Sequence, residues 1–406
     1  GAAGAGLTGV PTLVKDNVDV AGMPTQHGTT AFRAEPAGVH GGFAQDFLAT
    51  GLVPLGKTRL SEFGFSASAE YPDADPVRNP WDPAYSSGAS SAGSAAFVAA
   101  GVVPLAHAND GGGSIRIPAA ACGLVGLKPT RGRLRGDRLV QLMPVRIVAD
   151  GVVTRSVRDT AAFLREAEQV HRNLTLAPIG DVRRPLRRHL RVAVVTDPPG
   201  RRTDDETRET LLRTAGLLEE QGHRVEEVEA PVPPHFEEDF ALYWGSLAFA
   251  MVSGGRHTFG RSFDPALVDN LTRGLKQHTQ RRAHRLPAAI ARLRRARRTS
   301  ARFFADHDVV LTPVLGHTTP QLGHLAPTQS FDEIMGRLVD WVCFTPLQNA
   351  TGDPAVSLPM GATAQGLPIG VQVAGPWGSE RTLLELAYAL EEARPFRRID
   401  RVGESS

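Results

Sequence analysis

The stretch from Tyr85 to Thr130 reads YSSGASSAGSAAFVAAGVVPLAHANDGGGSIRIPAAACGLVGLKPT. It holds two serine clusters, GASSAGS at Gly88–Ser94 and DGGGSIRIP at Asp110–Pro118, and both are set among glycine and alanine. Glycine permits unusual dihedral angles and adds no bulk, so such segments let a backbone come close to a ligand. One helix-like run and one strand-like run separate the clusters. The stretch therefore predicts a site made of backbone amides and serine hydroxyls.

A lysine far upstream supplies a third candidate group. Lys15 ends the apolar run Val10–Val14 within GVPTLVKDNVDVAGMPT. A serine hydroxyl is a weak nucleophile unless a base removes its proton, and no histidine of this chain lies in a recognisable triad context. Burial lowers the pKa of a lysine because it disfavours the charged form. A partly buried Lys15 can therefore serve as the base of a Ser–Ser–Lys hydrolase.

These motifs resemble the amidase signature family. Most members carry GGSSGGS in the first cluster and D-x-GGS-I-R-x-P in the second, and the KDN at residues 15–17 matches their strand-end lysine. The similarity extends to NATGDPAVSLPMG and GLPIGVQVAG, so it covers nearly the whole chain. The resemblance implies that Ser114 is the nucleophile, Ser90 a bridging serine with a cis peptide bond, and Lys15 the base. Ser91 is the alternative for the bridging role, and the register of the motif favours Ser90.

The second cluster also offers an oxyanion site and its support. Asp110 and Arg116 flank the nucleophile and are expected to hold its loop. In many relatives a threonine stands at the position of Gly111, so its absence is expected to loosen the loop and to alter the oxyanion site or the acyl pocket. The glycine run lacks a GK[ST] ending and GxGxxG spacing, which argues against a phosphate cradle. The expected oxyanion donors are the backbone amides of Gly111, Gly112, Gly113 and Ser114.

Strand-like and helix-like segments alternate along the chain. This alternation predicts an α/β fold: one large domain, residues 1–406, with a mixed, mostly parallel twisted sheet covered by helices on both faces. A helical insertion is expected at about 236–306. The opening GAAGAG predicts a truncated or processed terminus, since relatives usually have a helical segment before the lysine strand. Strands are expected at Val10–Val14, Leu52–Leu55, Val102–Ala106, Arg191–Thr196, Val309–Pro313, Ala355–Leu358 and Gly370–Ala374, and helices at His40–Ala49, Ser91–Ala100, Val157–Ala167, Asp204–Glu220 and Glu380–Ala393.

Composition limits the location and partners. The 406 residues include 45 basic and 43 acidic side chains, a net charge of +2 that favours neither nucleic acid nor an anionic membrane. The arginine-rich run Arg281–Arg298 is expected to be a solvated helix face. Cys122 and Cys343 cannot form a disulfide framework, and neither a membrane span nor a signal peptide is evident. We expect a cytoplasmic protein that needs no metal or cofactor, binds a small-molecule amide, and is compatible with a homodimer.

The function predicted by the resemblance is hydrolysis of a carboxylic amide C–N bond to an acid and an amine or ammonia through a serine acyl-enzyme. PLAHAND at Pro104–Asp110 looks like the AHGND-type segment of nylon-oligomer hydrolases, which points to a stand-alone bacterial amidase. The alternatives are a glutaminase subunit of a tRNA-dependent amidotransferase and a non-catalytic scaffold. The substrate stays open, because its pocket walls are expected from the loops Phe63–Ser68, Gln141–Val145 and Phe344–Thr351.

Overall fold

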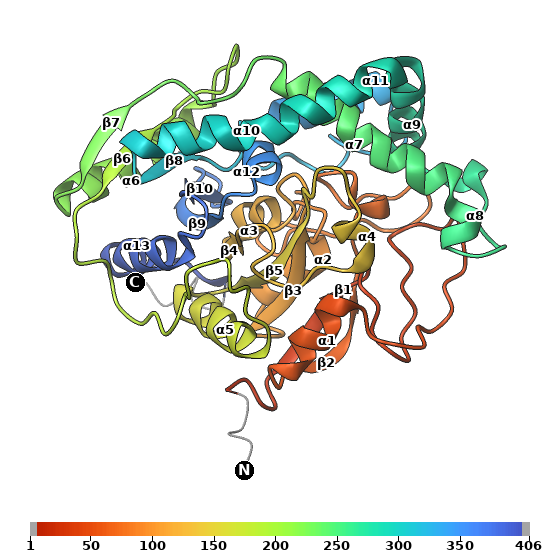
Figure 1. Cartoon of the computed structure of the whole chain (residues 1–406), viewed down its shortest axis with the longest axis horizontal. Helices are drawn as coiled ribbons and strands as arrows, with labels where there is room; N and C mark the ends of the chain where they lie inside the picture. The colour runs from red at the N-terminus through yellow and green to blue at the C-terminus, as the bar shows by residue number, and fades with distance from the viewer. Residues whose placement is uncertain (1–5, 400–406) are drawn as a thin grey trace.

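A mixed eight-stranded sheet runs through the molecule, with strand order β3-β5-β4-β9-β10-β8-β6-β7 (Figure 1). The computed structural model describes residues 6–399. Strands β1 and β2 form a separate parallel pair. The strands are β1 Pro11–Lys15, β2 Val53–Thr58, β3 Leu105–Asp110, β4 Val125–Lys128, β5 Ala149–Thr154, β6 Arg191–Val194, β7 Arg224–Glu227, β8 Val309–Pro313, β9 Ala355–Ala362 and β10 Pro368–Ala374.

Helices cover the large sheet on two sides. Helices α2 and α3 contact each other and strands β3, β4, β5, β9 and β10. Helix α13 contacts α5 and α6, and these three helices contact strands from β4 to β10. This arrangement confirms the predicted α/β domain with helices on both faces. The helices are α1 Gly42–Ala49, α2 Ala92–Ala99, α3 Arg116–Cys122, α4 Arg138–Gln141, α5 Val157–Val170, α6 Asp205–Glu220, α7 Phe236–Ser253, α8 Gly255–Thr258, α9 Asn270–Arg282, α10 Leu286–Asp306, α11 Phe331–Trp341, α12 Pro346–Thr351 and α13 Glu380–Ala393.

The sheet is mixed as expected, but its strands are not mostly parallel. Among the described residues, β8–β6 and β6–β7 pair in parallel. The other five pairs of the large sheet are antiparallel. Alternating helices and strands suggested crossover connections, but β9 and β10 form a hairpin, and β4 and β5 pair antiparallel through a long connection that contains the short helix α4. Whether two strands pair parallel or antiparallel depends on which strands become neighbours in the sheet. The order of helices and strands along the chain does not specify these neighbours.

The opening of the chain forms the predicted strand–helix–strand unit. β1 and β2 are parallel with α1 between them, and β1 packs beside β3. The hydroxyl of Thr12 donates to the carbonyl of Leu105 at 3.1 Å, and the backbone amide of Lys15 donates to Nδ1 of His107 at 3.2 Å. His107 therefore has a structural role, since its other ring nitrogen lies 3.2 Å from the carboxylate of Asp150. This packing brings the end of β1 to the end of β3, where the second serine cluster begins.

Most predicted elements occur within a few residues of their expected bounds. The strand expected at Val102–Ala106 starts later, at Leu105, because Val102 lies in a turn with 57% of its side chain exposed. The short strands β4, β5 and β7 were not predicted. Helices α7 to α10 fill the stretch expected to be helical, and Figure 1 shows α7, α8, α9 and α11 gathered at one end with α10 lying across the molecule. No helix within residues 6–399 combines the length and the apolar composition that crossing a bilayer requires.

Candidate active site

Lys15 lies at the end of β1 with its side chain fully buried. Its Nζ donates to Oγ of Ser90 at 2.7 Å and to Oδ1 of Asn109 at 2.7 Å, and it lies 3.4 Å from the carbonyl oxygen of Asn109. Asn109 is the second-last residue of β3, so the packing of β1 beside β3 creates these contacts. Asn109 was not predicted from the sequence. The only signal was its place directly before the Asp110 cluster.

The environment of Lys15 changes its protonation. Burial lowers the pKa of Lys15 from 10.5 to about 7, although the carboxylates of Asp110 and Asp150 partly oppose this shift. An amine with this pKa is about half neutral at pH 7. It can therefore accept a proton from a neighbouring hydroxyl near neutral pH.

The first serine cluster lies at the start of α2. The peptide bond between Ala89 and Ser90 is cis, as the resemblance implied. Gly88 has a φ of 67°, and a Cβ there would lie 2.9 Å from the Cα of Pro118, so this tight crossing requires glycine. Ser90 contacts Lys15, whereas the hydroxyl of Ser91 donates to the carbonyl of Ser114 at 2.6 Å. The geometry favours Ser90 for the bridging role and gives Ser91 the task of tying the two clusters together.

The second cluster turns sharply between β3 and α3. Gly113, with a φ of 137°, is the tightest point, since a Cβ there would lie 2.3 Å from Oγ1 of Thr345. Ser114 follows it and is 7% exposed. No hydrogen bond joins the hydroxyls of Ser90 and Ser114 in the described structure, but both residues line one cavity. The structure thus brings the two serine clusters and the lysine to one place.

Asp110 and Arg116 hold this loop together. Oδ2 of Asp110 accepts from Nε of Arg116 at 2.9 Å, and Oδ1 accepts from Nη2 at 2.9 Å, so the pair is bidentate and fully buried. Burial alone would raise the pKa of Asp110, but the adjacent guanidinium outweighs it and holds the pKa at about 2. These contacts suit the loop-support role expected for both residues. The sequence did not predict the side chains that complete the network, Gln348, Asn349 and Gln372, which lie more than 200 residues away along the chain.

The expected set of oxyanion donors needs one correction. The amide of Gly113 donates to Oδ1 of Asp110 at 2.7 Å, so it supports the loop instead of serving a ligand. The amides of Gly111, Gly112 and Ser114 have no acceptor among the described residues and remain candidate donors. The sequence suggested that the whole glycine run converges, but it could not show that the carboxylate of Asp110 turns back onto the loop.

A side chain from α7 lies in the space that a threonine at Gly111 would need. A Cβ on Gly111 would lie 3.1 Å from Cζ3 and 3.3 Å from Cη2 of Trp244, and 3.4 Å from Cγ2 of Val148. The indole of Trp244 donates from Nε1 to the carbonyl of Phe65 at 3.3 Å and meets the Phe65 ring edge-on. The glycine therefore permits an aromatic side chain of α7 to sit directly on the nucleophile loop.

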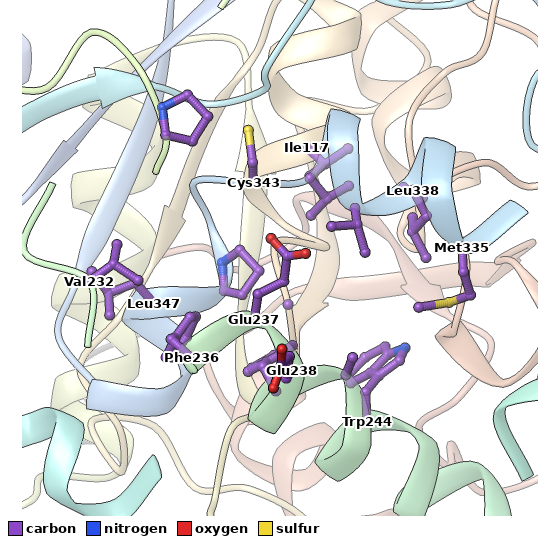
Figure 2. A pocket seen from close by; sticks show the side chains of 18 of the residues that line it. Ile117, Val232, Phe236, Glu237, Glu238, Trp244, Met335, Leu338, Cys343 and Leu347 are labelled. Carbon is purple, nitrogen blue, oxygen red and sulfur yellow. The ribbon is translucent and has the colours of Figure 1, made fainter. Parts of the chain in front are cut away.

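Two cavities meet at Ser114. One has a volume of about 490 Å³, and Figure 2 shows Phe236 and Trp244 from α7, and Met335 and Leu338 from α11, around it. The other, of about 850 Å³, includes Ser90 in its wall. The three loops expected to form pocket walls do contribute, but the large share from α7 and α11 was not predicted. Among residues 6–399, no group of three or more histidine, cysteine or acidic side chains is arranged to hold a metal ion.

Comparison with known proteins identifies the family. The family model described as Amidase matches residues 1–384. The chain belongs to the amidase family. It is 58% identical to AmiC of Mycobacterium tuberculosis, a protein assigned to the amidases, over 97% of this chain and 83% of the relative. The amidase is therefore a hydrolase of amide C–N bonds.

Solved structures agree with this assignment. The structure of 6-aminohexanoate cyclic dimer hydrolase superposes with a TM-score of 0.85 and 31% identity, covering 96% of this chain and 86% of that one. A bacterial aryl acylamidase of the amidase signature family gives a TM-score of 0.80 and 25% identity, over 97% of this chain and 84% of that one. The fold predicted from the sequence motifs, an amidase signature domain, is confirmed.

Proposed function

We propose that this amidase works through a serine acyl-enzyme, with Ser114 as nucleophile, Ser90 as proton relay and Lys15 as base. The observation that carries the proposal is the 2.7 Å contact between Nζ of Lys15 and Oγ of Ser90, at a lysine whose pKa burial lowers to about 7. Ser114 shares a cavity wall with Ser90, so a carbonyl that lies against Ser114 is near the relay.

The steps follow from this arrangement. Oγ of Ser114 attacks the amide carbon, its proton passes to Ser90, and the proton of Ser90 passes to neutral Lys15. The relay then returns a proton to the amide nitrogen as the C–N bond breaks and the amine leaves. Water repeats the attack on the Ser114 ester and releases the acid. In both acylation and deacylation, protons pass through Ser90 to Lys15 during the attack and return through Ser90 to the leaving group.

Backbone amides stabilise the charge that develops on the carbonyl oxygen. The amides of Gly111, Gly112 and Ser114 are the available donors, and Arg116 and Asp110 keep the loop that carries them in one conformation. Loss of one such donor typically costs about 2.7–4 kcal/mol of transition-state stabilisation. The buried ion pair therefore contributes to catalysis by positioning the loop.

Labelling with an aryl sulfonyl fluoride tests the nucleophile. We expect one modified peptide, carrying the label on Ser114, together with loss of activity in proportion to labelling. Ser114→Ala should abolish both, while Ser253→Ala, an exposed serine at the end of α7, should change neither. A Ser114→Ala variant that is still active, and that the reagent still labels and inactivates, would refute the assignment.

The glutaminase alternative is less well supported. A glutamine side chain would require a polar pocket, but the cavity beside Gly112 is lined mainly by apolar residues such as Ile117, Leu338, Val342 and Leu347. Ammonia release from glutamine tests this alternative, and we expect none above background. Turnover of any amide by the purified protein would also exclude the scaffold alternative.

We propose that the enzyme acts in the cytoplasm and without nucleic acid. Cys122 and Cys343 are both free thiols, which suits a reducing compartment. Several arginines of the basic run are engaged within the protein: Arg292 pairs with Asp239, and Arg297 stacks on the ring of Trp377. Light scattering of the purified protein would distinguish a monomer from a homodimer.

A further inference from the structure

The cavities on the two sides of Ser114 differ in which catalytic groups they contain. Four of the described residues line both: Gly64, Phe65, Ser114 and Trp244. Gly112 lines the smaller cavity, which we name the α7–α11 cavity after the helices in its wall. Ser90 and Asn109 line the larger one, which we name the relay cavity. A bound amide must place its two halves on opposite sides of the carbonyl carbon, so one half faces each cavity.

The position of Ser90 decides the orientation. In the proposed mechanism the departing nitrogen receives its proton from the Ser90 relay, so the amine half must lie on the side where Ser90 is exposed. That side is the relay cavity. The acyl half stays bonded to Ser114 after the amine has left, and it must therefore occupy the α7–α11 cavity. This assignment rests on the proposed function, because it uses the relay role of Ser90.

The two cavities also differ in chemistry. Both walls are largely apolar, and they differ in their charged side chains. In the α7–α11 cavity Glu237 is paired with Arg201 and Glu238 lies near His235. The wall of that cavity beside Ser114, with Phe240 and Leu338 among its residues, is apolar and aromatic. The wall of the relay cavity carries four acidic side chains and one arginine: Asp19, Glu35, Asp137, Asp150 and Arg138. Asp19 and Glu35 are exposed to solvent and form no ion pair within the described residues. A positively charged group is therefore favoured on the amine side and an apolar group on the acyl side.

Trp244 has the largest side chain among the residues that line both cavities. Its ring lies against Gly111, stacks near Phe240 and meets Phe65 edge-on. Figure 2 shows it on α7 at the edge of the α7–α11 cavity. A Cβ on Gly111 would lie 3.1 Å from the ring, so a side chain there would press the ring away by a few tenths of an ångström. Trp244 and Gly111 thus form one unit that fixes the boundary between the cavities.

We propose that Trp244, seated on Gly111, divides the active site into an acyl side and an amine side. We further propose that the enzyme hydrolyses amides joining an apolar carboxylic acid to an amine that carries an additional positive charge. The proposal names a substrate class and two specificity-determining residues. Trp244 has no role in the chemical steps themselves, and Gly111 takes part in them only through its backbone amide, which Gly111→Ala retains.

Two isomeric amides test the orientation. N-ethyloctanamide and N-octylacetamide have the same composition, but they carry the long chain on opposite sides of the carbonyl. We expect the octanamide to have a kcat/KM about tenfold or more above that of the acetamide, since each buried methylene is worth roughly threefold to fourfold. Equal values, or a preference for the acetamide, would overturn the assignment of the cavities.

A second series tests the charge. Octanoyl amides of butylamine, 1,4-diaminobutane and 4-aminobutanoate present a neutral, a cationic and an anionic amine half. We expect kcat/KM to be highest for the cationic compound and lowest for the anionic one, with a difference that shrinks as salt is added. Glu35→Gln should lower the cationic-to-neutral ratio about twofold to fivefold and leave the neutral substrate unchanged. A neutral substrate that equals or exceeds the cationic one would overturn the charge preference.

Variants at the boundary test the partition. Trp244→Ala should join the cavities and reduce the preference between the isomeric amides to about twofold or less, and Gly111→Ala should weaken it by displacing the ring. Phe249→Ala, an exposed aromatic on the same helix, and Gly216→Ala, at a helical glycine with open space around it, are the matched controls. They should retain the wild-type preference. An unchanged preference in Trp244→Ala would refute the partition.

One further measurement separates this inference from the proposed function. Sulfonyl fluoride labelling of Ser114 reports the nucleophile without regard to substrate structure. If labelling occurs and the isomer preference is absent, the partition is wrong while the acyl-enzyme mechanism stands. If Ser114 is neither labelled nor needed for activity, the proposed function fails first, and the orientation argument fails with it.

Discussion

The contact between Lys15 and Asn109 allows the assignment of Lys15 as the base to be tested with one substitution, Asn109→Asp, which adds a negative charge with little change in shape. Nζ of Lys15 lies 2.7 Å from Oδ1 of Asn109, and both residues are buried. Asn109→Asp replaces the carboxamide with a carboxylate of nearly the same shape, and it also removes the hydrogen bond that Nδ2 donates to Asn17. The ammonium form of Lys15 is then stabilised, and its pKa must rise above its value of about 7.

The magnitude follows from Coulomb's law with an opposing correction. Two unit charges separated by 2.7 Å in an effective dielectric of about 20 attract by about 6 kcal/mol. Burial of the new carboxylate cancels much of this, and adjacent opposite charges usually shift a pKa by about 1–3 units. A rise of about 2–3 units would leave roughly 0.1–1% of Lys15 neutral at pH 7, against about half in the wild type.

The assay is the pH dependence of kcat/KM. In the wild type we expect a tenfold rise per pH unit below about pH 7 and a plateau above it, because the neutral lysine is the active form. Asn109→Asp should be about 50-fold to 500-fold slower at pH 7, and it should recover most of its activity near pH 10. Recovery at high pH is expected if Lys15 is still present as the base but stays protonated at neutral pH.

Two controls separate charge from structure. Asn109→Ala removes the contact without adding charge, so its inflection should not move upward. Asn173→Asp adds the same charge in a distant turn and should leave the profile unchanged. If Asn109→Asp is slow but keeps an inflection near pH 7, the titrating group is not Lys15, and the mechanism based on that lysine is refuted.

Three further variants probe the nucleophile, the loop and the buried charge. Ser114→Ala should lose about 10³-fold or more in kcat with an unchanged melting temperature, and in the wild type added hydroxylamine should divert product to a hydroxamate, detected by mass spectrometry. Arg116→Lys keeps the charge but loses the bidentate contact to Asp110, so kcat should fall about 100-fold while KM changes little. Burial lowers the pKa of Lys128 to about 7, so the unfolded chain binds more protons than the folded one between that pH and 10.5, and stability rises with pH there by about 1.4 kcal/mol per unit. Buried Lys15, whose pKa is also about 7, contributes an equal rise, so Lys128→Met should halve the slope measured by urea unfolding and stabilise the protein at neutral pH.

The candidate site was predictable where it depends on local sequence. Lys15, Ser90 and Ser114 lie in motifs whose residue types and spacing carry the resemblance to the amidase signature family. The support roles of Asp110 and Arg116 were also predictable, because both lie within a few residues of the nucleophile. Short-range geometry could be anticipated from neighbours along the chain, and the structure agrees with it.

The remaining parts depend on contacts between distant segments. Asn349 binds Asp110 across 239 residues, and no local pattern at either position predicts the other. Trp244 reaches Gly111 only because α7 packs over the loop. The sequence shows that Gly111 lacks a side chain, but it does not show that an aromatic ring from α7 lies in that space. The same reason explains the error about the sheet. Helix and strand patterns specify elements, whereas strand direction depends on which elements become neighbours.

The distribution of functional residues over the fold explains how specificity can vary while the chemistry is kept. The groups proposed for the reaction lie at the end of β1, before α2 and before α3, all packed against the large sheet and fixed by buried polar contacts. Much of the wall of the α7–α11 cavity comes from α7 and α11, for which no contact with that sheet is among the main element contacts, and Ile117 of α3 and the nucleophile loop also line it. A substitution on α7 or α11 therefore reshapes the substrate space without moving Lys15, Ser90 or Ser114. Trp244 on Gly111 is where these two parts touch, so changes there are expected to alter substrate choice before they alter the chemical step.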